Sequence, residues 1–258
     1  TEDGKNWILG VHIADVANYV QERSALDREA LHRGTSVYLA DRVIPMLPHA
    51  LSNGICSLRP DEEKLTFSAI FELDPEANVV NKRIGRTVIR SDRRFTYEEA
   101  QERIEKGEGD YTKELVILND MAKKLRARRF EEGAVDFERA EVRFDIDETG
   151  KPTHVYFKES KDANKLIEEF MLLANRTVAE FIGSEMVRRL PGKKPSKAKT
   201  FVYRVHDKPD VEKLANLALI ASRFGYKVKT DGSERAVNKS INKLLSDIKG
   251  KGEENMLA

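Results

Sequence analysis

Segments of strand-type and helix-type sequence alternate along this 258-residue chain, and their order limits the folds open to it. The segment 7–16 (WILGVHIADV) is mostly apolar and predicts a buried strand. The runs 65–73 and 79–89 flank a turn-forming sequence, 74–78, and predict an antiparallel pair. Apolar positions at helical spacing predict a long helix over 163–189. We therefore expect an α+β fold, with a mixed, largely antiparallel sheet flanked by helices.

The other elements are shorter. Thr96-Tyr97-Glu98-Glu99 places a threonine three residues before a glutamate, the pattern of a capping box, and predicts a helix start. Prolines make 45–60 irregular. The pattern also predicts helices over 26–32, 113–130, 211–224 and 236–248, and short strands over 36–39, 137–144, 154–158 and 201–205.

Composition excludes several classes of protein. A single cysteine, Cys56, rules out an internal disulfide framework and cysteine-based zinc sites, and fits a reducing compartment. The longest apolar stretches are shorter than ten residues, whereas about 20 are needed to span a bilayer. The first residues lack the pattern of a signal peptide. We therefore expect a cytoplasmic protein with no membrane partner.

Charge is balanced overall but locally unmixed. The chain has 45 basic and 44 acidic residues, so its net charge of +1 selects no partner. The segment 186–204, however, has seven lysines or arginines and no acid, and 82–94 has six against Asp92 alone. Such runs either form a basic surface for a polyanion or are solvated faces, and composition leaves both open.

The residue types alone define no catalytic centre. Phosphate-binding glycine loops and a nucleophile elbow are absent, and the five histidines are scattered singly, as structural or surface residues are. Asp145 and Asp147 fit a solvated hairpin. Asp15 ends an apolar strand and must be paired, hydrogen-bonded or metal-associated, and we favour a structural role for it. Both ends of the sequence resemble cuts within a larger fold, so we expect a fragment.

A series of motifs, in order, resembles one family. They are Gly10–Val16 (GVHIADV), Gly34–Tyr38 (GTSVY), Val43–Pro48 (VIPMLP), Leu51–Leu58 (LSNGICSL), Phe95–Tyr97 (FTY), Leu166–Asn175 (LIEEFMLLAN) and Tyr203–Pro209 (YRVHDKP). Together they resemble the RNB catalytic domain of the ribonuclease R/ribonuclease II family, and are more similar to ribonuclease R. The resemblance extends over essentially the whole chain.

The resemblance implies a processive 3′→5′ exoribonuclease that hydrolyses single-stranded RNA to nucleoside monophosphates, using Mg²⁺ held by an aspartate-rich cluster. That cluster (DxxDFDDA) would precede residue 1, and the family's RSMxxAxY and SPIRRYxDL segments would follow residue 258. We thus expect residues 1–258 to be a partial RNB domain and a monomer, with no catalytic residue or metal ligand of its own. The alternative is a non-catalytic single-stranded RNA-binding module or an inactive relative.

The resemblance also assigns four RNA-binding residues. Tyr38 matches an aromatic that stacks on bases near the 3′ end, and Phe137 matches its partner. Tyr97 matches a tyrosine that favours RNA through the ribose, and Glu169, or Glu168 if the helix phase differs, matches a contact to the terminal nucleotide. Stacking is indifferent to base identity, and the 2′-hydroxyl distinguishes RNA from DNA, so these residue types suit those roles.

Overall fold

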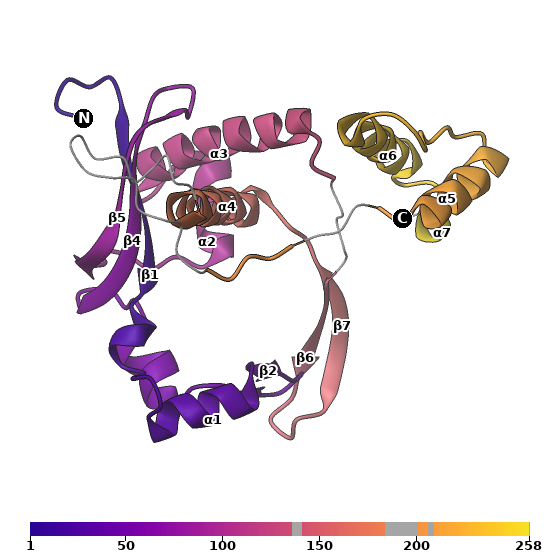
Figure 1. Ribbon diagram of the computed structural model, residues 1–258. Coiled ribbons are helices and arrows are strands. Elements are labelled where there is room, and N and C mark those ends of the chain that lie inside the picture. Colours follow the sequence, from indigo (N-terminus) through magenta and orange to yellow (C-terminus); the bar gives the residue numbers. More distant parts are fainter. Residues whose placement is uncertain (136–140, 184–200, 206–208, 258) are drawn as a thin grey trace. The chain divides into compact units, whose positions relative to one another are not determined.

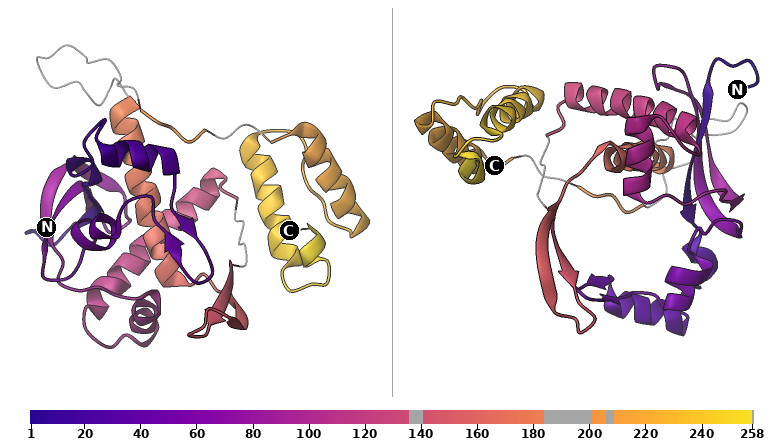
Figure 2. Two further views of the ribbon diagram at one scale, coloured as in Figure 1. Left: turned by 90° about the horizontal axis from the view of Figure 1, so that it is seen from below. Right: turned by 180° about the vertical axis from the view of Figure 1, so that it is seen from behind.

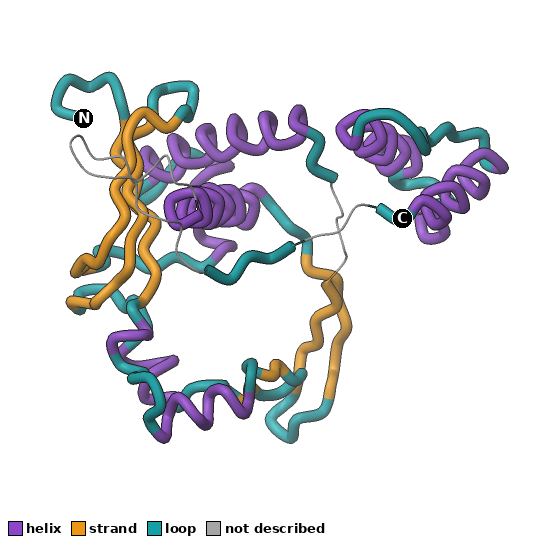
Figure 3. Tube along the Cα trace, in the orientation of Figure 1, coloured by secondary structure: helices purple, strands orange, loops and turns teal. Residues whose placement is uncertain are grey.

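The computed structural model describes residues 1–135, 141–183, 201–205 and 209–257. The chain divides into two compact units, Thr1–Ala122 with Ala140–Ala198 (unit 1) and Lys123–Arg139 with Lys199–Ala258 (unit 2). Helices and antiparallel strands occur together, which confirms the α+β class (Figure 3). None of the helices in the described ranges is long and apolar enough to cross a bilayer.

The main sheet has three antiparallel strands in the order β1-β4-β5 (Figure 1). They are β1 (Trp7–Ala14), β4 (Glu63–Leu73) and β5 (Val79–Arg90). The predicted pair and its turn are confirmed. The Asp74 carboxylate accepts hydrogen bonds from the backbone N–H and side-chain amide of Asn78, at 2.8 and 2.9 Å, and so closes the turn between β4 and β5.

Each face of this sheet is buried over only part of the length of β4, and the buried parts of the two faces lie towards opposite ends of the strand. Because paired residues of antiparallel strands project to the same side, Leu9 and Phe71 share one face, and both are buried there. Thr66 and Ser68 project to the other face nearer the opposite end of β4, and they are buried too. Strand β4 is therefore covered on one face near Phe71 and on the other face near Thr66.

A hydrogen-bond network joins polar side chains on the second face. His12 Nδ1 lies 2.6 Å from Ser68 Oγ, and the Thr87 hydroxyl lies 2.5 Å from Ser68 Oγ and 2.7 Å from Thr66 Oγ1. Partial burial lowers the pKa of His12. The His12 ring also occupies the space that a side chain at Gly10 would need. His12 is therefore a structural histidine that links three strands.

A helix and a second, two-stranded sheet follow β1. Helix α1 (Ala25–Arg33) begins at Ser24, whose hydroxyl accepts a hydrogen bond from the Asp27 N–H, and ends at Gly34, with φ of 69°. Strands β2 (Val37–Tyr38) and β3 (Val43–Ile44) form an antiparallel pair. The segment expected to be irregular contains a π-helical stretch, Ala50–Ile55, and a 3₁₀ turn, Val16–Asn18, follows β1.

Helices α2 (Tyr97–Lys106), α3 (Thr112–Glu132) and α4 (Asp162–Gly183) follow β5, as Figure 2 shows. Between α3 and α4 lies the hairpin of β6 (Glu141–Ile146) and β7 (Pro152–Lys158). Helix α4 packs against α2, where the buried Gln101 side-chain oxygen accepts the Ala163 N–H at 2.9 Å. Leu166 and Phe170 give α4 its buried face.

Unit 2 contains helices α5 (Val211–Arg223), α6 (Glu234–Ile248) and α7 (Glu254–Leu257). Helices α5 and α6 lie side by side (Figures 1 and 2) and share an apolar core of Ala221, Leu244, Ile248 and Leu257. The side-chain amides of Asn238 and Asn242 donate to the carbonyls of Gly133 and Ala134. These bonds attach the segment that follows α3 to α6.

Some expectations differ from the structure, and others lie partly outside the described residues. The strand predicted over 201–205 is wrong: these residues form no ladder, and Val202 and Val205 are 91% and 80% exposed. A strand needs a partner, and within the described residues no strand pairs with this segment. The described strands form three separate sheets instead of one. Parts of the predicted strand 137–144 and helix 163–189 lie outside the described ranges.

Candidate nucleic-acid interface

Tyr38 lies on a hairpin that its surroundings hold in place. It pairs with Val43, and the Ser36 hydroxyl, one residue before β2, accepts the Met46 N–H at 2.9 Å. Arg33, at the end of α1, donates to the Pro45 carbonyl at 3.0 Å. The Tyr38 side chain is nevertheless 78% exposed. A fixed backbone with a solvent-facing ring is suited to stacking on a base.

Tyr97 is positioned by the first turn of α2. Thr96 accepts the Glu99 N–H at 3.1 Å, and the Glu99 carboxylate accepts the Thr96 N–H at 2.9 Å, so the predicted capping box is confirmed. The hydrogen bond from the Thr96 backbone holds the pKa of Glu99 below its usual value. Tyr97 is the first helical residue, and its direction is therefore set by the cap.

An aromatic cluster fixes the residue that precedes this cap. The Arg93 and Arg103 guanidinium groups lie 4.7 and 5.0 Å from the centre of the Phe95 ring, and Tyr111 packs against that ring edge-on. Asp110 forms ion pairs with both arginines. Hydrogen bonding to Arg103, and then to Arg93, lowers the pKa of Asp110.

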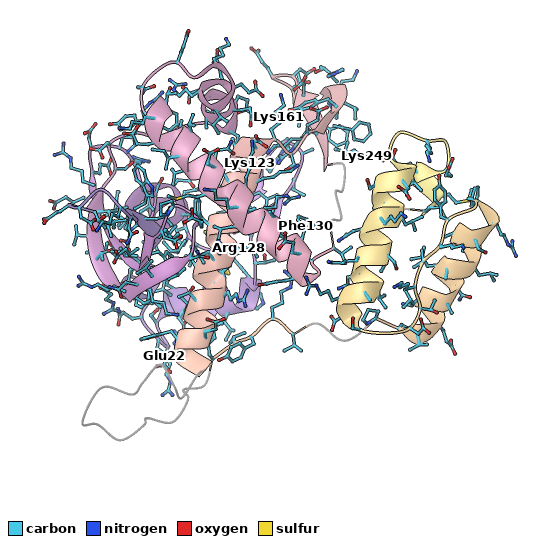
Figure 4. The ribbon with its side chains drawn as sticks, turned by 90° about the horizontal axis from the view of Figure 1, so that it is seen from above. Glu22, Lys123, Arg128, Phe130, Lys161 and Lys249 are labelled. Carbon is cyan, nitrogen blue, oxygen red and sulfur yellow. The ribbon has the colours of Figure 1, made fainter. Side chains whose placement is uncertain are left out.

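The Tyr97 ring borders a cavity of about 410 Å³. Lys158 of β7 lies 5.5 Å from the ring centre. Residues from α2, β7 and the start of α4 line the cavity, including Tyr156, Phe157 and Lys161, the last of which is labelled in Figure 4. Its charged lining residues are Glu98, Glu102, Glu105, Glu159, Lys158 and Lys161. Glu102 is paired with Lys106 at 2.7 Å, and Glu105 accepts the Gln101 amide at 2.8 Å. The carboxylates of this lining can accept hydrogen bonds from a group such as a hydroxyl.

Glu169 and Glu168 lie on different faces of α4. Glu169 is 3% exposed, on the same buried face as Leu166 and Phe170, whereas Glu168 is exposed. A buried carboxylate is costly unless it is paired, and Glu169 does have a hydrogen-bonding or charged partner. Of the two, Glu168 is the more accessible to a ligand from solvent.

The contacts do not bring all the predicted residues together. Phe137 lies outside the described residues. Among the side chains that the structure describes, no hydrogen bond, ion pair or ring contact joins Tyr38 to Tyr97. The motifs did not identify Tyr156 and Phe157, which line the same cavity as Tyr97. The signal that could have found them is the pair of adjacent aromatics directly before Lys158, at the end of a predicted strand.

The structure describes one of the two basic runs in full. In the run 82–94, Arg86 and Arg90 are paired with Asp15 and Asp61, and Arg93 with Asp110 and Glu99. Asp15, which is 6% exposed, is therefore paired, as a buried carboxylate requires. Most of the run 186–204 lies outside the described residues.

The domain is thus of the α+β class, with a solvent-facing tyrosine on a fixed hairpin and a second tyrosine beside a cavity lined by charged residues. The chain belongs to the RNB family, because the model of the RNB domain matches residues 1–257. It is 41% identical to ribonuclease R of Thermotoga maritima and 37% identical to ribonuclease R 1 of Lactococcus lactis, over 95% and 98% of its length.

A solved structure is similar as well. Ribonuclease R of Mycoplasma genitalium in complex with ribose-methylated single-stranded RNA matches with a TM-score of 0.83 and 27% identity, over 98% of this chain. The chain spans 30%, 33% and 38% of the lengths of the Lactococcus, Thermotoga and Mycoplasma proteins. It therefore corresponds to about a third of each relative.

Proposed function

We propose that this chain is part of a processive, magnesium-dependent 3′→5′ exoribonuclease that degrades single-stranded RNA to nucleoside monophosphates, and that it supplies RNA-contacting surface. The observation that carries the proposal is the 78% exposure of Tyr38 in a chain of the RNB family. The similar Mycoplasma protein was solved with single-stranded RNA, which supports the choice of ligand. We further propose that the protein is cytoplasmic, monomeric and without a membrane partner.

Tyr38 and Phe137 stack on bases in this proposal, and Tyr97 meets the ribose. The carboxylates that line the Tyr97 cavity support this role, since carboxylates accept hydrogen bonds from hydroxyls. Glu169 contacts the terminal nucleotide in this proposal, with the exposed Glu168 as the alternative.

The described residues do not fit a magnesium site. Within the ranges that the structure describes, no group of three or more histidines, cysteines, aspartates or glutamates could hold a metal ion. We therefore assign no metal-dependent step to these side chains. The proposal places the ligands of the catalytic metal outside the described residues.

Binding tests the ribose role directly. The 258-residue chain is titrated against labelled RNA and DNA of one sequence, with fluorescence anisotropy as the readout. We expect the parent chain to bind RNA more tightly than DNA. In Tyr97→Phe the ratio of RNA affinity to DNA affinity should be smaller, because the hydroxyl is lost but the ring is kept. Tyr111→Phe, on a tyrosine outside the cavity, is the matched control. An unchanged ratio in Tyr97→Phe contradicts the assignment.

A time course on 5′-labelled oligo(A) with Mg²⁺, resolved on a denaturing gel, tests the position of the catalytic centre. We expect the chain to leave the substrate intact. A ladder that shortens from the 3′ end would show that carboxylates of this chain bind metal, and Asp15 would be the first to substitute.

The second candidate function is a non-catalytic single-stranded RNA-binding module. It is favoured by the lack of a metal-binding cluster among the described residues. The two candidates differ in the full-length gene product: Mg²⁺-dependent shortening of oligo(A) supports the enzyme, and RNA binding without shortening supports the module.

A further inference from the structure

A groove of about 750 Å³ lies in unit 2, between α5 and α6. Ala218 and Ser222, one turn apart on α5, and Ala236 and Ser240, on α6, contribute to its lining. The two helices share a core that includes Ala221 and Leu244. Because the four lining side chains are short, the helices leave this space open beside that core.

Four lysines line the groove. Lys227 and Lys229 lie on the segment that joins the two helices, and Lys239 and Lys243 lie one turn apart on α6. All four are exposed. Among the residues that line the groove, Asp231 is the one carboxylate. No ion pair within the described part of the chain involves any of the four lysines. The groove therefore has a surplus of uncompensated positive charge.

Of the four hydroxyl-bearing residues that line the groove, Ser222, Tyr226 and Ser240 have their hydroxyl groups engaged in hydrogen bonds, and Thr230 has no such bond within the described residues. Ser240 Oγ accepts the Lys229 N–H at 2.9 Å and donates to the Val237 carbonyl, and Ser222 Oγ donates to the Leu219 carbonyl. The Tyr226 hydroxyl donates to Glu253 at 2.6 Å. These bonds hold the connecting segment against α6 and leave the ammonium groups as the main means of recognition. A ligand would be selected by negative charge and not by its pattern of hydrogen bonds.

We propose that this groove binds the phosphodiester backbone of RNA, without regard to sequence. The inference rests on the proposed function for the choice of RNA. Lys239 and Lys243 are separated by about 6 Å along the helix axis, so each can meet a different phosphate of one strand. The lysines repel one another when the groove is empty, and a polyanion relieves that repulsion while it releases counterions.

The test compares two double variants of the whole chain. Lys239→Gln/Lys243→Gln removes two groove charges. Lys213→Gln/Arg223→Gln removes two exposed charges of α5 that lie outside the groove and have no ion-pair partner in the described ranges. Binding of labelled oligo(U) is measured by anisotropy over a series of salt concentrations. Circular dichroism checks that both variants fold like the parent chain.

A plot of log K against log salt concentration has a negative slope. We expect the groove variant to make that slope shallower by about 1.4, which is roughly 0.7 for each lost phosphate contact. We expect the control to leave the slope nearly unchanged. Equal slopes and affinities in the two variants overturn the groove proposal while leaving the proposed function intact. A parent chain that binds no oligo(U) at any salt concentration overturns both.

Discussion

Coupling between Asp15 and Arg86 tests how burial sets the strength of an ion pair. Arg86 Nε lies 2.9 Å from Asp15 Oδ2, and the Asp15 side chain is 7% exposed while that of Arg86 is 68% exposed. Exposed pairs contribute about 0–1 kcal/mol, whereas breaking a fully buried pair costs about 3–5 kcal/mol. Because one partner is buried and the other is solvated, we expect a coupling energy of about 1–2 kcal/mol.

The measurement is a double-mutant cycle with Asp15→Asn and Arg86→Gln. Urea unfolding is followed by the fluorescence of Trp7, which is the single tryptophan and lies on β1, opposite Leu73. Its signal therefore reports on the sheet that contains the pair.

The same strand offers a matched control. Arg90 pairs with Asp61 at 3.3 Å, and both side chains are exposed, at 64% and 78%. We expect its coupling energy to be no more than about 0.5 kcal/mol. If the cycle for Asp15 and Arg86 gives no larger a value than this control, the argument from burial is refuted.

Three further substitutions have defined outcomes. Tyr38→Ala should weaken binding of oligo(A) and oligo(U) by about 5- to 150-fold, since one stack contributes roughly 1–3 kcal/mol to binding. The urea midpoint should stay unchanged, and Tyr38→Phe should bind nearly as tightly as the parent chain. An unchanged affinity of Tyr38→Ala in anisotropy titrations excludes the stacking role. Burial lowers the pKa of His12 in the folded protein below its ordinary value of 6.5. The contribution of neutral His12 to the free energy of unfolding is therefore complete above pH 6.5, and it is lost as the pH falls towards the pKa of the folded state. His12→Asn should therefore lose less unfolding free energy between about pH 7.5 and about pH 5.5 than the parent does, and an equal loss in urea titrations contradicts this. Thr96→Ala should lower the free energy of unfolding by about 1 kcal/mol, because it removes the cap of α2. Thr96→Ser keeps a hydroxyl and should retain most of that stability. Equal urea midpoints for the parent and both variants would show that the cap adds no stability.

Local patterns predicted much of the fold. The capping box at Thr96, the turn at Asp74 and the glycine that ends α1 each depend on residues within one or two turns of each other. Their geometry is therefore visible in a single stretch of sequence. The Asp147 turn is another case, since its carboxylate accepts hydrogen bonds from the N–H groups of Thr149 and Lys151.

Features that depend on distant residues could not be predicted in the same way. The segment 201–205 has a strand-like composition, but composition does not say whether a partner strand is present. The Tyr97 cavity is lined by both α2 and β7, and its carboxylates come from α2 and from Glu159, which follows β7. The lysine groove requires Lys227, on the segment before α6, and Lys243, on α6, to line the same space. The motifs identified Tyr38 and Tyr97 but not these surroundings.

The order of strands in the main sheet also has a consequence for how the protein folds. A five-residue turn, 74–78, joins β4 to β5, whereas residues 15–62 separate β1 from β4. Closing a loop roughly tenfold longer costs about 2 kcal/mol more in chain entropy. The β4–β5 hairpin should therefore form first, and β1 should join a pair that already exists. By the same reasoning β1 is the strand that detaches most readily, and its amide hydrogens should exchange with solvent before those shared by β4 and β5.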